Sequence, residues 1–231
     1  MNYEERIAEL IEKHTFISKT DVVYTLVLED IIEGRLKGGS RLNQEDLSMQ
    51  FGISRSPVRE ALNRLASDGY LVKSNASGYR VYDLRLEDYI SLNEFRNMME
   101  SFGSSLAVKN ITGNELDILK RNIEETKEAV EKKDTKAFLH LDEEFHGLLI
   151  EAGKNPHLIE AYNSYGQRFH LFGILTLSQE MLAIAYKWHV KILQAVISGN
   201  AEEVAKTTRL HREATINSAL RICRNKWSTE D

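Results

Sequence analysis

Four side chains that can bind a metal ion stand at helical positions in the second half of this 231-residue sequence. Asp142 and His146 are four residues apart, so they project together from one helix. His189 and His211 lie on the inner stripes of two later helices. A lone histidine on an apolar stripe is usually a packing residue, but one carboxylate and three imidazoles together suit Zn²⁺ or a similar first-row divalent ion. We therefore expect a metal site.

The helices that must position these ligands are predicted to follow one another from Leu86 to the C-terminus. Residues 86–110 form the first, and Thr112 and Asp134 are N-cap residues of the next two. The last three cover about residues 155–177, 179–198 and 201–225. Six helices without a convincing strand predict an antiparallel bundle over residues 85–231, and bundle interiors hold ligands and metals between facing helices.

A second candidate site lies in residues 42–65, where two short helices are predicted on either side of Gly52. Asn43 caps the first helix, and the second begins at Ser54 and tolerates Pro57 in its first turn. The second helix buries Val58, Ala61, Leu62 and Leu65, and its opposite face carries Arg55, Arg59 and Arg64. A helix that presents arginines from its first turns is what the major groove of DNA requires.

A β-hairpin is predicted behind this pair of helices. Residues 68–73 and 79–82 are β-prone and flank a small polar turn. Together with a first helix capped by Thr20 or Asp21, they predict a winged helix-turn-helix domain over residues 20–84. Residues 1–19 form an extra N-terminal helix whose role the sequence does not reveal. The expected fold class is mainly α, a winged helix-turn-helix followed by an all-α bundle.

The segment Ser-Arg-Ser-Pro-Val-Arg-Glu-Ala-Leu at 54–62 closely resembles the signature of the GntR family of bacterial transcription factors. Gly39-Ser40-Arg41-Leu42, Asp68-Gly69 and Gly78 extend the resemblance. It implies a homodimer that binds a palindromic double-stranded DNA operator. Glu45-Asp46 depart from those members that place an arginine there, which removes a phosphate contact. The expected DNA-binding residues are Arg41, Ser54, Arg55, Ser56, Arg59 and Gly78.

The helical half resembles the FCD branch of the same family. That branch has an Asp-x3-His pair followed by two histidines about 22 residues apart, and His189 and His211 have this separation. The resemblance implies a divalent ion, zinc or nickel, that holds a small carboxylate effector. Arg96 stands at the FCD arginine position and would grip the effector, unless it forms only a solvated intrahelical pair with Glu100. Further pocket candidates are Tyr162, Gln167, Arg168 and Asn217.

Composition and charge agree with a DNA-binding protein outside the membrane. The net charge is −5, but residues 34–83 hold eight basic and five acidic side chains, a local charge of +3 that leaves −8 for the remainder. No apolar run approaches the ~18 residues that span a bilayer. The single cysteine, Cys223, cannot form an internal disulfide, which fits a reducing compartment, so we expect a cytoplasmic protein.

Two other functions fit the four ligands. The first is a metal-dependent enzyme, a hydrolase or oxygenase, which would need a general base beside an open metal site. Glu143 and Glu144 are adjacent in sequence but point away from Asp142 and His146 on the helix, which disfavours an enzyme. The second is a purely structural metal, which predicts a closed site without a small-molecule response.

Overall fold

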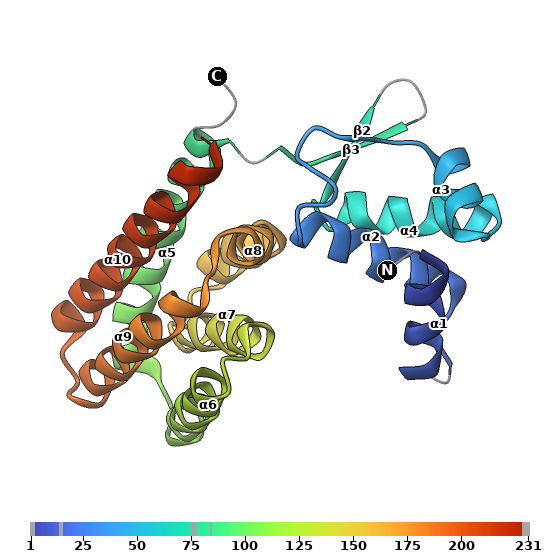
Figure 1. Cartoon of the computed structure of the whole chain (residues 1–231). Helices are drawn as coiled ribbons and strands as arrows, with labels where there is room; N and C mark the ends of the chain where they lie inside the picture. The colour runs from blue at the N-terminus through green and yellow to red at the C-terminus, as the bar shows by residue number, and fades with distance from the viewer. Residues whose placement is uncertain (1–2, 14–15, 75–77, 84, 228–231) are drawn as a thin grey trace. The chain divides into compact units, whose positions relative to one another are not determined.

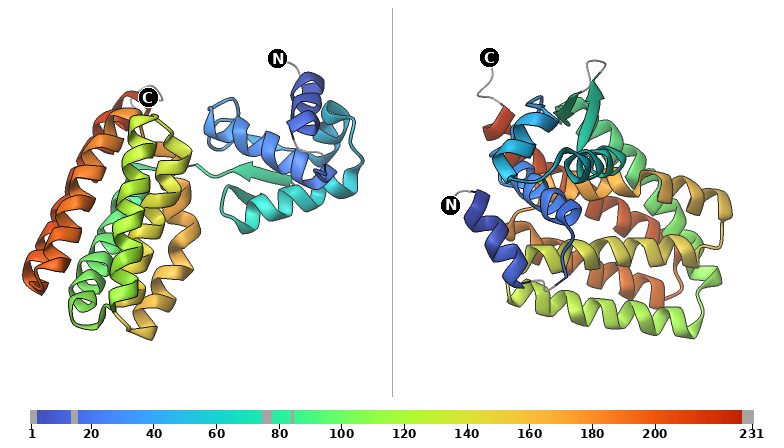
Figure 2. Two further views of the ribbon diagram at one scale, coloured as in Figure 1. Left: turned by 90° about the horizontal axis from the view of Figure 1, so that it is seen from below. Right: turned by 90° about the vertical axis from the view of Figure 1, so that its right-hand side faces the viewer.

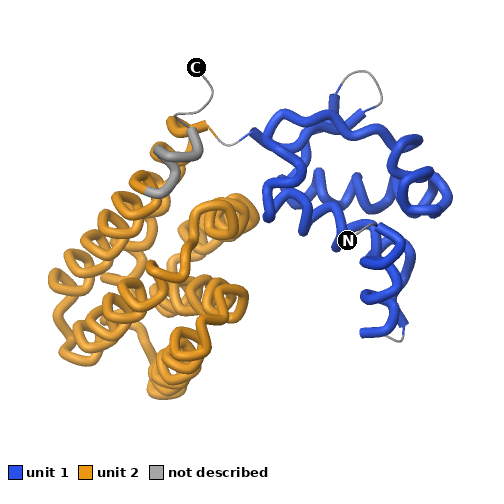
Figure 3. Tube along the Cα trace, in the orientation of Figure 1, with its two compact units in different colours: residues 1–84 blue, residues 85–231 orange. Residues whose placement is uncertain are grey.

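The computed structural model describes residues 3–13, 16–74, 78–83 and 85–227, with side chains as far as Arg221. The chain divides into two compact units, residues 1–84 (unit 1) and residues 85–231 (unit 2), shown in Figure 3. The middle of the predicted polar turn and the side chain of Cys223 lie outside the described part. The predicted mainly helical class is confirmed. No helix in the described ranges is long and apolar enough to cross a membrane.

The described part of unit 1 combines four helices with a small antiparallel sheet (Figure 1). Its elements are α1 (Tyr3–Lys13), α2 (Lys19–Ile32), β1 (Arg41–Leu42), α3 (Gln44–Phe51), α4 (Arg55–Ser67), β2 (Leu71–Ser74) and β3 (Gly78–Val81). The sheet order is β1-β3-β2, with Leu71 opposite Val81 and Arg41 opposite Arg80. The predicted hairpin is β2 and β3. Strand β1 was not predicted from the sequence, because two residues are too few to show alternation.

Local capping explains where the helices of unit 1 begin and end. The Asn43 side chain accepts a hydrogen bond from the Glu45 amide at 2.9 Å, and Gly52 ends α3 with a φ of 62°. The predicted cap of α2 was wrong. Ser18, rather than Thr20 or Asp21, caps that helix, because its hydroxyl accepts from the free Asp21 amide at 3.1 Å.

The extra N-terminal helix α1 packs on α2 and α3 within unit 1. The Tyr3 hydroxyl donates to Asp30 Oδ2 at 2.5 Å, and Arg6 Nη1 donates to Asp30 Oδ1 at 2.7 Å. The Tyr3 ring also lies edge-on to Phe51 at the end of α3, 4.6 Å between ring centres. Burial of Tyr3 and its hydrogen bond to Asp30 raise the pKa of its hydroxyl to about 12. Helix α1 is therefore tied to the helix-turn-helix.

Unit 2 is a bundle of six described helices (Figures 1 and 2). They are α5 (Leu86–Asn110), α6 (Gly113–Glu131), α7 (Thr135–Ala152), α8 (Pro156–Thr176), α9 (Gln179–Ile197) and α10 (Ala201–Trp227). Helix α5 packs between α7 and α10, and α9 packs against both α6 and α10. The core holds Leu119, Phe145, Leu149 and Ile192, each almost fully buried.

The predicted N-caps of unit 2 are confirmed. Thr112 and Glu115 form a capping box in which the Glu115 carboxylate accepts from the Thr112 amide at 2.8 Å. The Asp134 carboxylate accepts from the Ala137 amide at 2.9 Å. These caps fix the starts of α6 and α7, and therefore the angular position of the side chains that α7 presents to the bundle interior.

Candidate functional site

The predicted DNA-reading residues of α4 lie together on the surface of unit 1. Ser54, Arg55, Ser56 and Arg59 are all exposed in the first two turns of the helix. Ser54 is the N-cap by backbone conformation, but its hydroxyl makes no capping hydrogen bond. The buried stripe of α4 is the predicted one, so this set faces away from the core of the unit.

Two of the arginines on α4 are already engaged within unit 1. Arg55 Nη2 forms an ion pair with Glu45, one of the two acidic residues at the start of α3. Arg64 Nη1 pairs with Asp21 on α2 at 2.9 Å, and its guanidinium lies 4.4 Å from the centre of the Tyr24 ring. The prediction that placed Arg64 on one face with Arg55 and Arg59 was wrong, because nine residues turn a helix by about two and a half turns.

The remaining two predicted DNA contacts lie on the sheet. Arg41 is exposed on β1, and its cross-strand neighbour is Arg80 on β3. Gly78 begins β3 opposite Ser74 on β2. The structure thus divides the six predicted residues into a helix set and a sheet set. It also brings Arg41 beside Arg80, which was not among the predicted DNA contacts.

The four predicted metal ligands converge in the interior of unit 2. Asp142 and His146 come from α7, His189 from α9 and His211 from α10, and one ligand atom of each lies within 4.8 Å of the others. His189 Nε2 is 3.2 Å from Asp142 Oδ1, and the Nε2 atoms of His146 and His211 are 3.3 Å apart. All four residues are buried.

The electrostatics of this cluster leave lone pairs available to a cation. Burial, reinforced by Arg212, holds the pKa values of His146 and His211 well below that of an ordinary histidine. Burial opposes ionisation of Asp142, but the His189 ring 3.2 Å away and the charge of Arg212 outweigh it and hold the pKa of that carboxyl well below its usual range. Neutral imidazoles and an ionised carboxylate are what a divalent ion binds.

A buried ion cluster lies beside the four ligands and is centred on Glu100 of α5. Arg96 Nε donates to Glu100 Oε1 at 2.6 Å, Arg212 Nη2 donates to the same oxygen at 3.1 Å, and the Tyr162 hydroxyl donates to it at 2.9 Å. The two arginines hold the pKa of Glu100 below its ordinary value against the effect of burial. The Arg96–Glu100 pair does exist, but the expectation that water surrounds it was wrong.

Arg212 is a site residue that the sequence analysis missed. It is buried, lines the pocket and has Nη2 3.8 Å from Asp142 Oδ2. Its spacing along α10 could have revealed this burial. Arg212 stands four residues after Thr208 and seven before Ala219, so it shares a helix face with these two fully buried residues. A cation on such a stripe needs a carboxylate partner, and only the fold shows that Glu100 supplies it.

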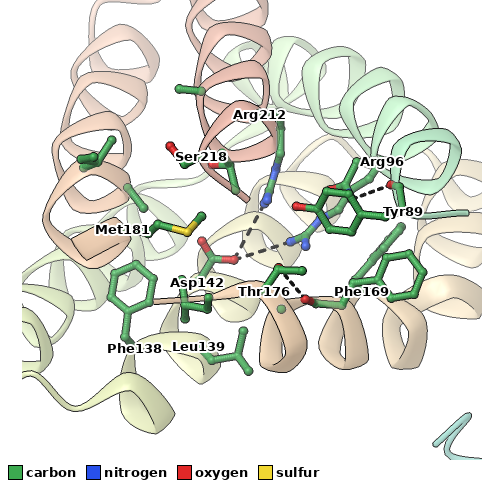
Figure 4. Close-up of a pocket in the computed structure, with 18 residues that line it drawn as sticks. Tyr89, Arg96, Phe138, Leu139, Asp142, Phe169, Thr176, Met181, Arg212 and Ser218 are labelled. Carbon is green, nitrogen blue, oxygen red and sulfur yellow. Dashed lines mark hydrogen bonds and ion pairs between the residues drawn. The ribbon is translucent and has the colours of Figure 1, made fainter. Parts of the chain in front are cut away.

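A small cavity opens beside Asp142 and the two arginines (Figure 4). About 50 Å³ of it is accessible to water, which is space for a few water molecules. Arg96 Nη2 is buried 3.6 Å from Asp142 Oδ2 and has no hydrogen-bond partner among the described residues. The rest of the lining is mainly apolar and includes Phe138, Leu139, Phe169, Phe172 and Met181.

The other pocket candidates from the sequence do not line this cavity. Gln167, Arg168 and Asn217 are exposed. Tyr162 is buried but is not part of the lining, and its hydroxyl donates to Glu100. The helical period alone could not separate the three positions on α8, because aromatic and polar side chains alternate around that helix.

The two glutamates beside the ligand pair are directed elsewhere. Glu143 Oε1 lies 2.7 Å from Nδ1 of His170, and Glu144 accepts a hydrogen bond from Asn122 at 2.9 Å. Neither carboxylate faces the four-ligand cluster, so neither is placed to act on a molecule bound there.

Comparison with protein families places both units. Residues 19–81 match the model of bacterial regulatory proteins of the gntR family, and residues 91–214 match the FCD domain. An uncharacterized HTH-type transcriptional regulator of Bacillus subtilis, YdhC, is 29% identical over 191 residues, covering 81% of this chain and 85% of the relative. The Nta operon transcriptional regulator of Aminobacter aminovorans is 28% identical over 80% of this chain and 87% of its own length.

Solved structures share the fold. Lar, which controls the expression of the Listeria monocytogenes agr system, has a TM-score of 0.70 at 23% identity, covering 90% of this chain and 99% of the compared one. E. coli McbR/YncC has a TM-score of 0.63 at 22% identity, with the same coverage. At this level of identity the likeness concerns the fold alone.

Proposed function

This chain belongs to the GntR family of bacterial regulatory proteins with an FCD domain, and from that premise we propose that it binds a palindromic operator as a homodimer, under the control of a small carboxylate held on a divalent metal. The chain is a transcriptional regulator and not the metal-dependent enzyme considered above, because its two domains and its relatives are those of transcriptional regulators.

The DNA part of the proposal is supported by the exposed set on α4. Ser54, Arg55, Ser56 and Arg59 present hydroxyls and guanidiniums from the start of one helix, the end that reaches base edges in the major groove. Arg41 and Gly78 lie on the sheet and would meet the phosphate backbone beside it. A single winged helix-turn-helix domain with so modest a positive charge binds DNA weakly. We therefore propose that two copies bind the two halves of an inverted repeat.

The metal part of the proposal depends on how well the four residues fit an ion. Two atoms bound about 2.1 Å from one ion lie about 3–3.5 Å apart. The separations of 3.2 Å and 3.3 Å in the cluster are of this size. The lowered pKa values of Asp142, His146 and His211 also suit metal binding. We propose zinc or nickel on Asp142, His146, His189 and His211, where the ion would supply a Lewis-acid anchor for a carboxylate.

The observation that carries the effector is the buried Nη2 atom of Arg96 without a hydrogen-bond partner among the described residues. A buried guanidinium N–H that lacks an acceptor is costly, and a carboxylate in the adjacent cavity would satisfy it. Glu100 holds the other edge of the same guanidinium, so Arg96 is fixed before the ligand arrives. The size of the cavity restricts the effector to a small organic acid.

The test is elemental analysis of the purified full-length protein, followed by calorimetry with acetate, lactate, succinate and citrate as probes. His189→Ala should lower metal content and acid binding together. Arg96→Met should leave the metal content unchanged and weaken binding of the acid at least about tenfold, because it removes a charge-assisted hydrogen bond. Arg168→Met, an exposed arginine on α8, is the matched control and should change neither quantity.

Three outcomes separate the alternatives. Metal in the wild type with no response to any acid would support a purely structural ion. Wild-type protein without metal, or unchanged acid binding in the His189 variant, would overturn the site as proposed. Effector binding must also change operator affinity, and by linkage the operator must change effector affinity by the same factor.

The operator is tested with duplexes selected from a random library by the purified protein. We expect a short inverted repeat whose half-sites lie on a common face of the duplex. Footprinting that showed one asymmetric half-site, occupied by a monomer, would contradict the homodimer.

A further inference from the structure

The outward side of α5 carries two large apolar side chains that the bundle leaves uncovered. Met98 is 60% exposed, and Phe102, one turn further on, is 54% exposed. Helices α5 and α10 pack side by side (Figures 1 and 2). Met98 and Phe102 border an open groove between them, which is also lined by small side chains such as Ser101, Ser105 and Ala205. Adjacent exposed apolar groups with a polar rim mark an interaction surface.

The order of large and small side chains on this side of α5 is self-complementary. In an antiparallel pair of α5 helices with the two-fold axis between positions 101 and 102, Met98 faces Ser105 of the second copy. Phe102 then faces Ser101 of the second copy. Each large side chain therefore meets a small one, which is the arrangement that lets two helices interdigitate closely.

The charges at the two ends of this surface obey the same symmetry. Glu94 lies eight residues before Phe102 and Lys109 seven residues after it, and both are exposed. At a helical rise of ~1.5 Å per residue they stand about 12 Å and about 11 Å from Phe102. An antiparallel pair therefore brings Glu94 of each copy to Lys109 of the other, whereas a parallel pair would place like charges together.

We infer that this surface is where two copies of the chain meet, antiparallel, through α5. We call it the α5 face; its members are Glu94, Met98, Ser101, Phe102, Ser105 and Lys109. The inference rests on the proposed function in one respect, because a palindromic operator requires two readers related by a two-fold axis. The α5 face supplies an interface in unit 2 that satisfies this requirement.

The test is sedimentation equilibrium of the full-length protein. Phe102→Glu places a charge in the centre of the contact and should raise the dimer dissociation constant at least about 100-fold. Glu94→Lys or Lys109→Glu alone sets like charges against each other and should raise it about tenfold. The double variant E94K/K109E restores opposite charges and should return to within about threefold of the wild type. Glu124→Lys, exposed on α6, is the charge-matched control.

The outcomes distinguish this inference from the proposed function. A wild-type dimer that Phe102→Glu does not weaken, or a double reversal without rescue, overturns the α5 face and leaves operator recognition by another dimer intact. A monomeric wild type overturns both. Circular dichroism checks that each variant folds; if Phe102→Glu does not fold, the two exposed charge positions decide the question.

Discussion

The two units use their arginines in opposite ways. In unit 1 the Arg55 side chain is 68% exposed, and its ion pair with Glu45 is open to water. In unit 2 the side chains of Arg96 and Arg212 are 7% and 3% exposed, and both pair with Glu100. An exposed pair is worth little and can be exchanged for a phosphate, whereas a buried one is held in a single arrangement. Unit 1 therefore suits a large polyanion, and unit 2 suits one small anion.

The largest expected effect comes from removing the shared carboxylate of unit 2. Glu100→Gln leaves two buried guanidiniums with only the more distant carboxylate of Asp142 as a charge partner. Removing one partner from a buried pair destabilises a protein by about 3–5 kcal/mol. We expect a loss of this size in the free energy of unfolding, measured by urea denaturation with the metal content held constant.

The matched change in unit 1 sharpens the comparison. Glu45→Gln breaks the exposed pair with Arg55 and should change the free energy of unfolding by less than about 1 kcal/mol. Equal losses of unfolding free energy in Glu100→Gln and Glu45→Gln would show that burial does not make the ion pairs of the two units differ in strength.

The next effect tests the exception in unit 1, the carboxylate of Asp30. Its side chain is 1% exposed and accepts from Tyr3, Arg6 and Arg35. Asp30→Asn removes charge-assisted hydrogen bonds and should lower the free energy of unfolding by about 2–3 kcal/mol. We expect less than for Glu100, because Arg35 is half exposed and regains water. Hydrogen exchange of the α1 amides measures whether that helix is released from α2. Unchanged protection in α1 would show that Asp30 does not hold the helix in place.

A smaller effect concerns operator binding. Arg59→Ala should weaken it by about 1–3 kcal/mol if the guanidinium contacts a base, and should also reduce discrimination between operator and scrambled DNA. Arg55→Ala should lose less, because Arg55 must first leave Glu45. Gel-shift titration at fixed salt measures both variants. Unchanged operator affinity in both the Arg55 and the Arg59 variant would show that α4 is not the recognition helix.

The smallest effect is at the exposed start of α6. Hydrogen bonds from Lys154 and the Thr112 amide lower the pKa of Glu115 to about 2. Because the folded pKa is depressed, the stabilisation is present above pH ~4.5 and is lost as the pH falls towards 2. Glu115→Gln should therefore lie below the wild type in melting temperature at pH 7 and approach it in acid. A difference in melting temperature that stayed constant from pH 7 to pH 2 would show that the charge of Glu115 is not what stabilises the protein.

Local signals in the sequence predicted most of the secondary structure. Gly52, Thr112 and Asp134 act through their own backbone neighbours, so their turn and caps could be recognised without the fold. The start of α2 was misplaced because Ser18, Thr20 and Asp21 all have capping side chains, and only the hydrogen bond from the Asp21 amide selects among them.

The sequence by itself determined the two units' helical patterns, the exposed arginines of α4 and the four metal-ligand candidates, because spacing along one helix fixes which side chains share a face. Only the tertiary structure decided that the ligands from α7, α9 and α10 converge. It also decided that Arg212 reaches the carboxylate of Glu100 and that Arg64 turns to Asp21. These contacts join residues far apart in the chain, and their energy depends on burial and on the angle between helices, which no periodic pattern encodes.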